Sequence, residues 1–177
     1  MSRYVLRPAE INDAEGIACV HVQSWQETYR GMVPDHFLNG LSIPRQMDRW
    51  VGSLSNPTDP YHRVIVVKED GRIVGFANYG IPQQPDDEFD GELYAIYILK
   101  SAQRHGNGRM LFTEAARGLL ALGSSSMLVW VLKDNPARGF YERLGGMHVR
   151  EKNIEIGGKL LEEVAYGWRE LKTFQPG

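Results

Sequence analysis

A strand-like run followed by a basic, glycine-containing turn is the segment whose residue types point most directly to chemistry. It covers residues 92–108, Glu-Leu-Tyr-Ala-Ile-Tyr-Ile-Leu-Lys-Ser-Ala-Gln-Arg-His-Gly-Asn-Gly. Its apolar half predicts a buried strand, and a helix is expected to begin near Gly108. The first turn of a helix carries unpaired N–H groups and partial positive charge, and glycines let the backbone close around an anion. The segment therefore predicts a site for a pyrophosphate-bearing cofactor, held mainly by the main chain.

Side chains of the same turn add positive charge and neutral hydrogen-bond donors. Lys100, Arg104 and Arg109 are cations, and the glutamine and asparagine amides donate without charge. The histidine of the turn is expected to be a pyrophosphate contact or a surface group. The expected cofactor-binding residues of the turn are Gln103, Arg104, His105, Gly106, Asn107, Gly108 and Arg109.

A second segment with a recognisable residue pattern is Asn-Pro-Ala-Arg-Gly-Phe-Tyr-Glu-Arg-Leu-Gly at residues 135–145. Asn135 at the cap and Pro136 at the first helical position predict the start of a short helix. Phe140 and Leu144 recur at helical spacing and are expected to face the core, and the glycines that follow end the helix.

The elements around these two segments predict one layered α/β domain. An Asp-Gly pair at residues 70–71 is a strong hairpin signal between two Val- and Ile-rich runs. A mixed sheet is expected, antiparallel at both ends and parallel where helix 109–122 crosses over. Strands are expected over 3–7, 62–68, 72–79, 93–99, 127–132, 148–156 and 159–168, and helices over about 13–29, 34–41, 43–54 and 109–122.

Length and charge limit the class of protein. A chain of 177 residues is enough for one domain with a real core, expected over residues 1–172, with 173–177 as a C-terminal tail. The net charge of −2 argues against nucleic acid as a partner, because neutralising phosphates requires clustered surplus cations.

The single cysteine, Cys19, excludes an intrachain disulfide and a thiolate zinc site. The five histidines match no recognised ligand spacing, so no metal is expected. The N-terminal sequence lacks a signal-peptide core, and no apolar run is long enough to span a bilayer. A cytoplasmic chain without a membrane partner is therefore expected.

Both motif segments resemble the GCN5-related N-acetyltransferase (GNAT) family. Residues 103–108 match its Gln/Arg-x-x-Gly-x-Gly/Ala acetyl-coenzyme A loop, and residues 135–145 are similar to its Asn…Ala…Phe-Tyr-Glu-x-x-Gly helix. Asn135 and Phe140 lie one residue closer together than in many members. The spacing between the motifs fits one helix and one strand, and the element order agrees over nearly the whole chain, which is the structural context such motifs require.

The resemblance implies a fold and a cofactor. The fold is a mixed, mostly antiparallel sheet of six to seven strands, with helices on both faces and a splay between strands 4 and 5. Acetyl-CoA is the implied cosubstrate, with its pantetheine arm against main chain of residues 95–98 and 127–131. The implied cofactor contacts outside the basic turn are Ala95, Ile96, Tyr97, Ile98, Asn135, Arg138, Phe140 and Tyr141.

The implied reaction moves an acetyl group to a primary amine by direct attack in a ternary complex. Glu92 is in register with the general-base glutamate of the histone-acetylating branch of the family. Tyr141 resembles the family's general acid, which protonates the departing thiolate. The alternatives are structural: Glu92 as a solvated strand-end carboxylate with a pKa near ~4.3, and Tyr141 as an amphipathic residue at the core rim.

The acceptor pocket has no readable code in the sequence. Trp25, Tyr29, Tyr79 and Glu92 are its expected residues, and the acceptor is a small-molecule or peptide amine. His21 lies at four-residue spacing from Trp25. A histidine among aromatic residues is more often a hydrogen-bonded structural residue than a catalyst, and a substrate contact is the other interpretation. The acidic run 86–90 is expected to be a solvated loop, with attraction of a cationic amine as its other interpretation. Members of the GNAT family often pair through edge strands, so the resemblance also implies a homodimer.

Three other functions differ from an acetyltransferase in the sequence features that they require. A dinucleotide-binding dehydrogenase is excluded because position 111 is leucine where the third fingerprint glycine belongs. A non-catalytic acyl-CoA sensor of the same fold would keep the basic turn without turnover. A purely structural or partner-binding module would need no such turn.

Overall fold

A seven-stranded sheet forms the centre of the protein in a computed structural model, which describes residues 4–174. Residue 3 of the expected first strand and residues 175–177 of the expected tail lie outside that range. The strands are β1 (Tyr4–Pro8), β2 (Arg63–Glu69), β3 (Arg72–Gly80), β4 (Glu92–Ile98), β5 (Met127–Leu132), β6 (Met147–Ile156) and β7 (Lys159–Trp168). The helices are α1 (Ala14–Thr28), α2 (Asp35–Asn39), α3 (Ile43–Leu54), α4 (Asn107–Ala121) and α5 (Arg138–Arg143), with short 3-10 turns η1 (Ile11–Asp13), η2 (Lys100–Ala102) and η3 (Leu171–Thr173).

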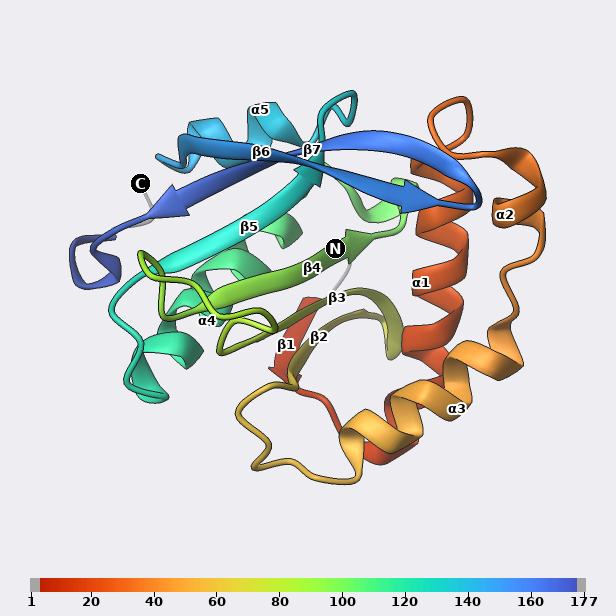
Figure 1. The fold of residues 1–177 in the computed structure, drawn as a ribbon. Helices are drawn as coiled ribbons and strands as arrows, with labels where there is room; N and C mark the ends of the chain where they lie inside the picture. The colour runs from red at the N-terminus through yellow and green to blue at the C-terminus, as the bar shows by residue number, and fades with distance from the viewer. Residues whose placement is uncertain (1–3, 175–177) are drawn as a thin grey trace.

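The strand order β1-β2-β3-β4-β5-β7-β6 confirms the expected mixed sheet (Figure 1). Among the strand pairs that residues 4–174 form, only β4–β5 is parallel, and α4 makes the crossover between these strands. Every other pair is antiparallel. No helix within residues 4–174 is long and apolar enough to cross a membrane.

The two central strands separate after a short contact. β4 and β5 are paired at Glu92–Leu128 and at Leu93–Val129, and from there they diverge while β4 continues to its end at Ile98. β5 keeps its other edge on β7 along its whole length. The expected splay between strands 4 and 5 is therefore present, and main-chain groups of both strands face the gap.

A bulge in β4 contributes to this divergence. Asn78 of β3 pairs with Ala95, whereas the next residue, Tyr79, pairs with Leu93. Tyr94 is thus the extra residue on β4. A bulge bends its strand and changes the direction of nearby main-chain groups. Here it lies just beyond the last residue of β4 that pairs with β5.

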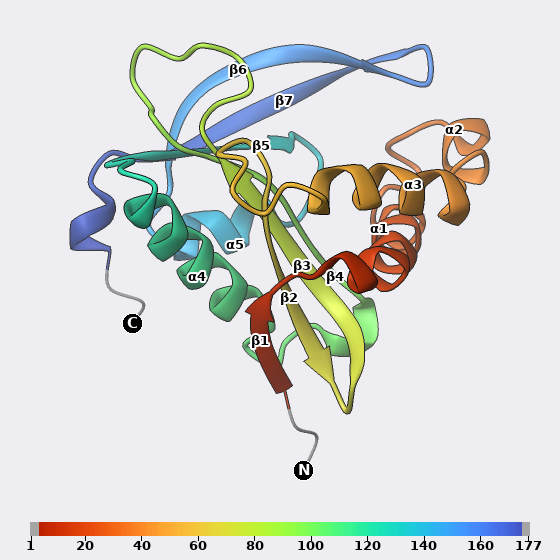
Figure 2. The ribbon, with the colours of Figure 1, turned by 90° about the horizontal axis from the view of Figure 1, so that it is seen from below.

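Helices cover both faces of the sheet, as Figure 2 shows. Phe76 points to the α1 and α3 side, where it packs with Ile17 and Trp50. Its neighbour Ala77 points to the other side, where it joins the core formed with Leu111 and other residues of α4. Alternation along β3 therefore separates an α1/α3 face from an α4/α5 face.

Two helix starts differ from the sequence expectation. α4 begins at Asn107, directly after Gly106, whose φ is +83°. α5 begins at Arg138 rather than at the proline, because Asn135 Oδ1 accepts the N–H of Ala137 at 2.9 Å and forms a turn before the helix. Local side-chain-to-backbone bonding therefore delays this helix.

Candidate active site

The basic turn between β4 and α4 is shaped by left-handed backbone. Arg104 has φ +64° and Gly106 has φ +83°. A Cβ built on Gly106 would meet nothing within 4 Å, so the space in front of this residue is open. Glycine has no side chain to cap the helix, and the first turn reads Asn-Gly-Arg. The leading N–H groups of α4 are therefore available to an anion, with exposed Arg104 and Arg109 beside them.

The amides of Asn107 and Gln103 donate to carbonyls of the protein itself, contrary to the expectation that they offer donors to phosphate. Asn107 is 1% exposed, and its Nδ2 donates to the carbonyl of Ala102 at 2.9 Å. Gln103 Nε2 donates to the carbonyl of Ile98 at 3.0 Å. Both amides therefore hold the turn against the end of β4. His105 is exposed, with its ring 6.1 Å from that of Tyr4.

The two sequence motifs meet at Gly108. A Cβ built there would lie 3.1 Å from Cε2 of Phe140, so the glycine permits close packing of α4 against α5. Phe140 also makes an edge contact with Phe112 at 6.4 Å. This packing fixes α5 relative to the basic turn.

Tyr141 is the more deeply buried residue of α5, although Phe140 was expected to face the core. Tyr141 is 6% exposed, whereas Phe140 is only partly buried. Arg138 Nε donates to Tyr166 Oη at 3.0 Å, and its Nη1 donates to the carbonyl of Lys133 at 3.0 Å. These bonds hold Arg138 on β7 and the loop after β5, rather than on the basic turn.

Tyrosines from three elements come together beside the β4–β5 gap. Burial raises the pKa of Tyr29 to about 12. Burial also raises the pKa of Tyr97 and Tyr141, and the nearby hydroxyls reinforce both shifts. Asn135 Nδ2 donates to Tyr29 Oη at 3.4 Å. At neutral pH all three phenols are protonated, so each can donate a proton.

Glu92 is half-buried at the start of β4, and its Oε2 accepts the N–H of Gln83 at 3.1 Å. Burial raises the pKa of this carboxyl. The Gln83 N–H and the Lys152 ammonium oppose the shift, while Asp86 and other carboxylates reinforce it. A carboxylate with a raised pKa is a stronger base than an exposed one.

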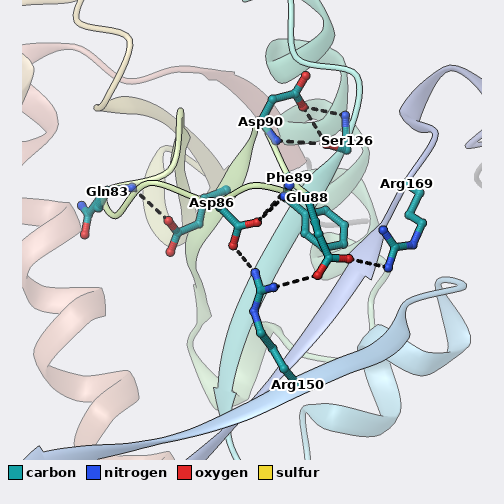
Figure 3. Close-up of polar contacts among 9 residues, drawn as sticks. Gln83, Asp86, Glu88, Phe89, Asp90, Ser126, Arg150 and Arg169 are labelled. Atoms are coloured by element: carbon teal, nitrogen blue, oxygen red, sulfur yellow. Dashed lines mark hydrogen bonds and ion pairs between the residues drawn. The ribbon is translucent and has the colours of Figure 1, made fainter.

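The acidic loop between β3 and β4 is anchored by arginines and does not lie free in solvent (Figure 3). Arg150 of β6 pairs with Asp86 and, at 3.1 Å, with Glu88. Arg169 pairs with Glu88 at 2.7 Å. Phe89 is 2% exposed, and the two guanidinium groups lie 6.0 and 5.3 Å from its ring centroid. The expected solvated loop is therefore a folded cover over β5 and β7.

The end of this loop is fixed separately. The Asp90 carboxylate accepts the N–H groups of Ser125 and Ser126 at 2.8 to 3.0 Å, and both serine hydroxyls as well. Burial by itself would raise the pKa of Asp90, but these bonds outweigh it and lower the pKa. The loop that brings the Gln83 N–H to Glu92 is therefore fixed at two places, by the arginines at Asp86 and Glu88 and by the serines at Asp90.

We expect Arg150→Gln to lower the free energy of unfolding by about 1 kcal/mol, because it removes the partner of two loop carboxylates. The loss should shrink in concentrated salt, which screens such pairs. Urea unfolding at low and high salt measures both effects. Lys133→Gln is the matched control, since its 3.1 Å pair with Glu162 is exposed on both sides. Equal losses in the two variants would contradict anchoring by Arg150.

The expected acceptor residues of α1 line one side of Tyr97. The Trp25 ring lies 4.6 Å from Tyr29 and 6.4 Å from Tyr97. His21 stacks on Tyr97 at 5.4 Å, and its Nδ1 accepts the indole N–H of Trp50 at 3.3 Å. Burial lowers the pKa of His21 to about 4, so it is neutral at pH 7. The structure thus places His21 in a structural cluster with Trp50, Phe76 and Tyr97.

Tyr79 does not lie with these residues. It is 8% exposed and belongs to the core on the α4 face. Its hydroxyl occupies the space that a Cβ on Gly118 would need. The alternation of β3 places this ring on the same face as Ala77 and away from the α1 face, which corrects its expected role in the acceptor pocket.

Sequence reasoning missed four residues near Glu92: Gln83, Trp130, Lys152 and Glu163. The signal for Trp130 and Glu163 is an aromatic or charged residue at a partly buried position of an alternating strand, and exposed Lys152 is found only through its strand pairing with Glu163. Lys152 Nζ lies 4.0 Å from the Trp130 ring centroid and 3.7 Å from Glu163 Oε2. The contact of Gln83 carries no such signal, because it is made by the main chain.

Comparisons with known proteins give a consistent result. The sequence model of the Acetyltransferase (GNAT) family matches residues 23–146. The uncharacterized N-acetyltransferase YuaI of Bacillus subtilis is 38% identical over 170 residues, covering 96% of this chain and 95% of the relative.

Two solved structures share the fold. The PaiA N-acetyltransferase of Thermoplasma acidophilum, in complex with coenzyme A, superposes with a TM-score of 0.72 at 18% identity, covering 91% of this chain and 98% of the other. YncA of Salmonella typhimurium, with its cofactor acetyl-CoA, gives a TM-score of 0.69 at 16% identity and 98% coverage of both chains.

Proposed function

This chain belongs to the GNAT family of acetyltransferases, and from that premise we propose that it transfers the acetyl group of acetyl-CoA to a primary amine by direct attack in a ternary complex. The observation that carries the proposal is the position of the β4–β5 gap, which has the uncapped start of α4 on one side and Glu92 at its closed end. One ligand can therefore bind phosphates and present a reactive group between the strands.

The residues present fit such a ligand. Open space lies in front of Gly106, two exposed arginines flank it, and β4 offers main-chain groups to the gap. We assign the diphosphate to N–H groups of residues 104–109 and the pantetheine arm to main chain of 95–98. Phe140 and the Asn135 turn hold α5 against this path. Acetyl-CoA supplies the activated acyl group.

The acid–base steps are assigned to this chain's own residues. Freeing a lysine-like amine of pKa ~10.4 from its proton at pH 7 costs about 4–5 kcal/mol, so a base is useful. Glu92 takes that proton, directly or through water. Main-chain N–H groups near the Tyr94 bulge stabilise charge developing on the carbonyl oxygen. Tyr141 gives its phenolic proton to the departing thiolate.

Two measurements test the proposal. Calorimetric titration with acetyl-CoA should show binding, and an amine panel should release free thiol. Binding without turnover on any amine would favour the non-catalytic sensor. Absence of binding would remove the cofactor assignment altogether.

The turn itself offers a matched pair of variants. We expect Gly106→Ala to weaken coenzyme A binding, because alanine at φ +83° is strained by about 1–2 kcal/mol and shifts the turn. Gly158→Ala is the control: its φ is +81°, open space also surrounds it, and it lies in the β6–β7 turn. Both should lose similar stability in urea. Equal dissociation constants of coenzyme A for the two variants would contradict the assignment of the diphosphate to this turn.

Three further expectations remain predictions: a single acetyltransferase domain over residues 1–172, a cytoplasmic location and a homodimer. Light scattering of the purified protein tests the last of these.

A further inference from the structure

A patch of charged side chains lies between apolar clusters on one face of the sheet. Glu163 of β7 pairs directly with Leu132 of β5 and with Lys152 of β6, so these three side chains share one face. Trp130, two residues before Leu132, lies on the same face. An apolar cluster around Leu132 borders the patch on the α2 side, and the cluster around Phe89 borders it on the loop side.

The patch consists of fixed groups and one adaptable cation. The Glu163 side chain is 14% exposed, whereas Lys152 is 46% exposed. The Lys152 ammonium lies 4.0 Å from the Trp130 ring centroid and 3.7 Å from Glu163 Oε2. An aromatic face beside a carboxylate is a favourable site for an organic cation. Because lysine has a long flexible stem, its ammonium can leave that site for solvent.

Charge balance links the patch to Glu92. Burial raises the pKa of Glu163 and of Glu92, and the Lys152 ammonium opposes both shifts. The nearby Asp86 is paired with Arg150, whose guanidinium also pairs with Glu88. Two carboxylates therefore share one ammonium, which leaves a net negative charge beside the base.

We propose that Trp130 and Glu163 bind a second cationic group of the acceptor, at the place that the Lys152 ammonium now occupies, so that the acceptor is a diamine or a similar dication. This inference rests on the proposed function, since it assumes that the reacting amine lies near Glu92. One amine loses its proton at Glu92, and the distal ammonium stays charged and displaces Lys152 from Trp130. An acceptor with a distal carboxylate would instead meet two carboxylates and is disfavoured.

The test compares α,ω-diamines of increasing length with the monoamine and the ω-amino acid of matched length, each with saturating acetyl-CoA. The best diamine should exceed its monoamine in kcat/KM by about tenfold or more. Glu163→Gln should bring that ratio close to one, and Lys152→Met should lower KM for the diamine. Glu162→Gln is the control, because this exposed neighbour pairs with Lys133.

Each outcome decides between the two proposals. Equal kcat/KM for monoamine and diamine overturns the dication site but leaves the acetyltransferase assignment in place. A preference for the ω-amino acid has the same consequence if Lys152→Met abolishes that preference. If no amine is acetylated, calorimetry of the diamine with the coenzyme A-loaded protein decides. Diamine binding that Glu163→Gln weakens supports the site while the proposed activity fails, and no diamine binding overturns the site.

Discussion

Replacing Glu92 by glutamine is expected to lower kcat/KM for the amine by about 10²-fold at pH 7, the usual contribution of a positioned base. Glutamine keeps the size of the side chain, and its carbonyl can still accept the Gln83 N–H. What it removes is the capacity to take a proton. The variant therefore isolates proton transfer from packing.

The pH dependence gives the sharper readout. Burial raises the pKa of Glu92, so wild-type activity should rise as the pH passes upward through that raised value. This limb should be absent from Glu92→Gln. The deficit should narrow as the pH approaches the amine's own pKa of ~10.4, where free amine is abundant. Parallel pH profiles for the two proteins would remove Glu92 from the mechanism.

Stability provides an independent check with a definite sign. A carboxyl whose pKa is raised by folding holds its proton more tightly in the folded state. Folding stability of the wild type therefore falls as the pH rises from the usual carboxyl pKa through the raised one. Glu92→Gln should lack this fall and should be at least as stable at pH 7. Glu114→Gln, on exposed α4 surface, is the control for a lost carboxylate.

Tyr141→Phe is the second large effect, with kcat expected to fall about 10- to 100-fold for loss of a positioned acid. The dissociation constant of acetyl-CoA should change little, because the ring still fills its place between Phe140 and Trp168. Burial raises the pKa of Tyr141, so the phenol stays protonated across the working range. Single-turnover measurement prevents product release from masking the effect.

Tyr79→Phe is the matched comparison for that variant. It also removes a buried hydroxyl, but one that lies against Gly118 on α4. We expect its kcat to stay close to the wild-type value. A similar loss of kcat in both variants would mean that the effect comes from packing and would argue against proton donation by Tyr141.

Local chemistry made much of the fold predictable. The hairpin at Asp70 and Gly71 has φ of +47° and +86°, as its residue types indicate, and the glycine at 106 adopts the left-handed backbone that the basic turn requires. Apolar periodicity gave the order of strands and helices, and the mixed sheet follows from that order. These features depend on contacts between residues close in sequence, which the sequence displays directly.

Side-chain orientation was less predictable. Asn107 reads as a donor for phosphate, yet it is buried and holds the turn together. Tyr79 faces α4 through the alternation of β3, which the sequence does not orient, whereas Tyr97 faces α1 because the bulge at Tyr94 puts it on the opposite face from Leu93. A single extra residue reverses the face of each side chain beyond it, and no local pattern announces where that residue falls.

The sequence by itself determined the family, the order of the elements and the turn suited to an anion, because each rests on residue types at short spacing. Only the tertiary structure decided which groups surround Glu92. Arg150 reaches the loop at Asp86 across 64 positions of the chain, and Lys152 meets Trp130 and Glu163 through strand register. Such contacts form between residues that are distant in sequence, so the pairing of β5, β6 and β7 had to be known before their charges could be placed.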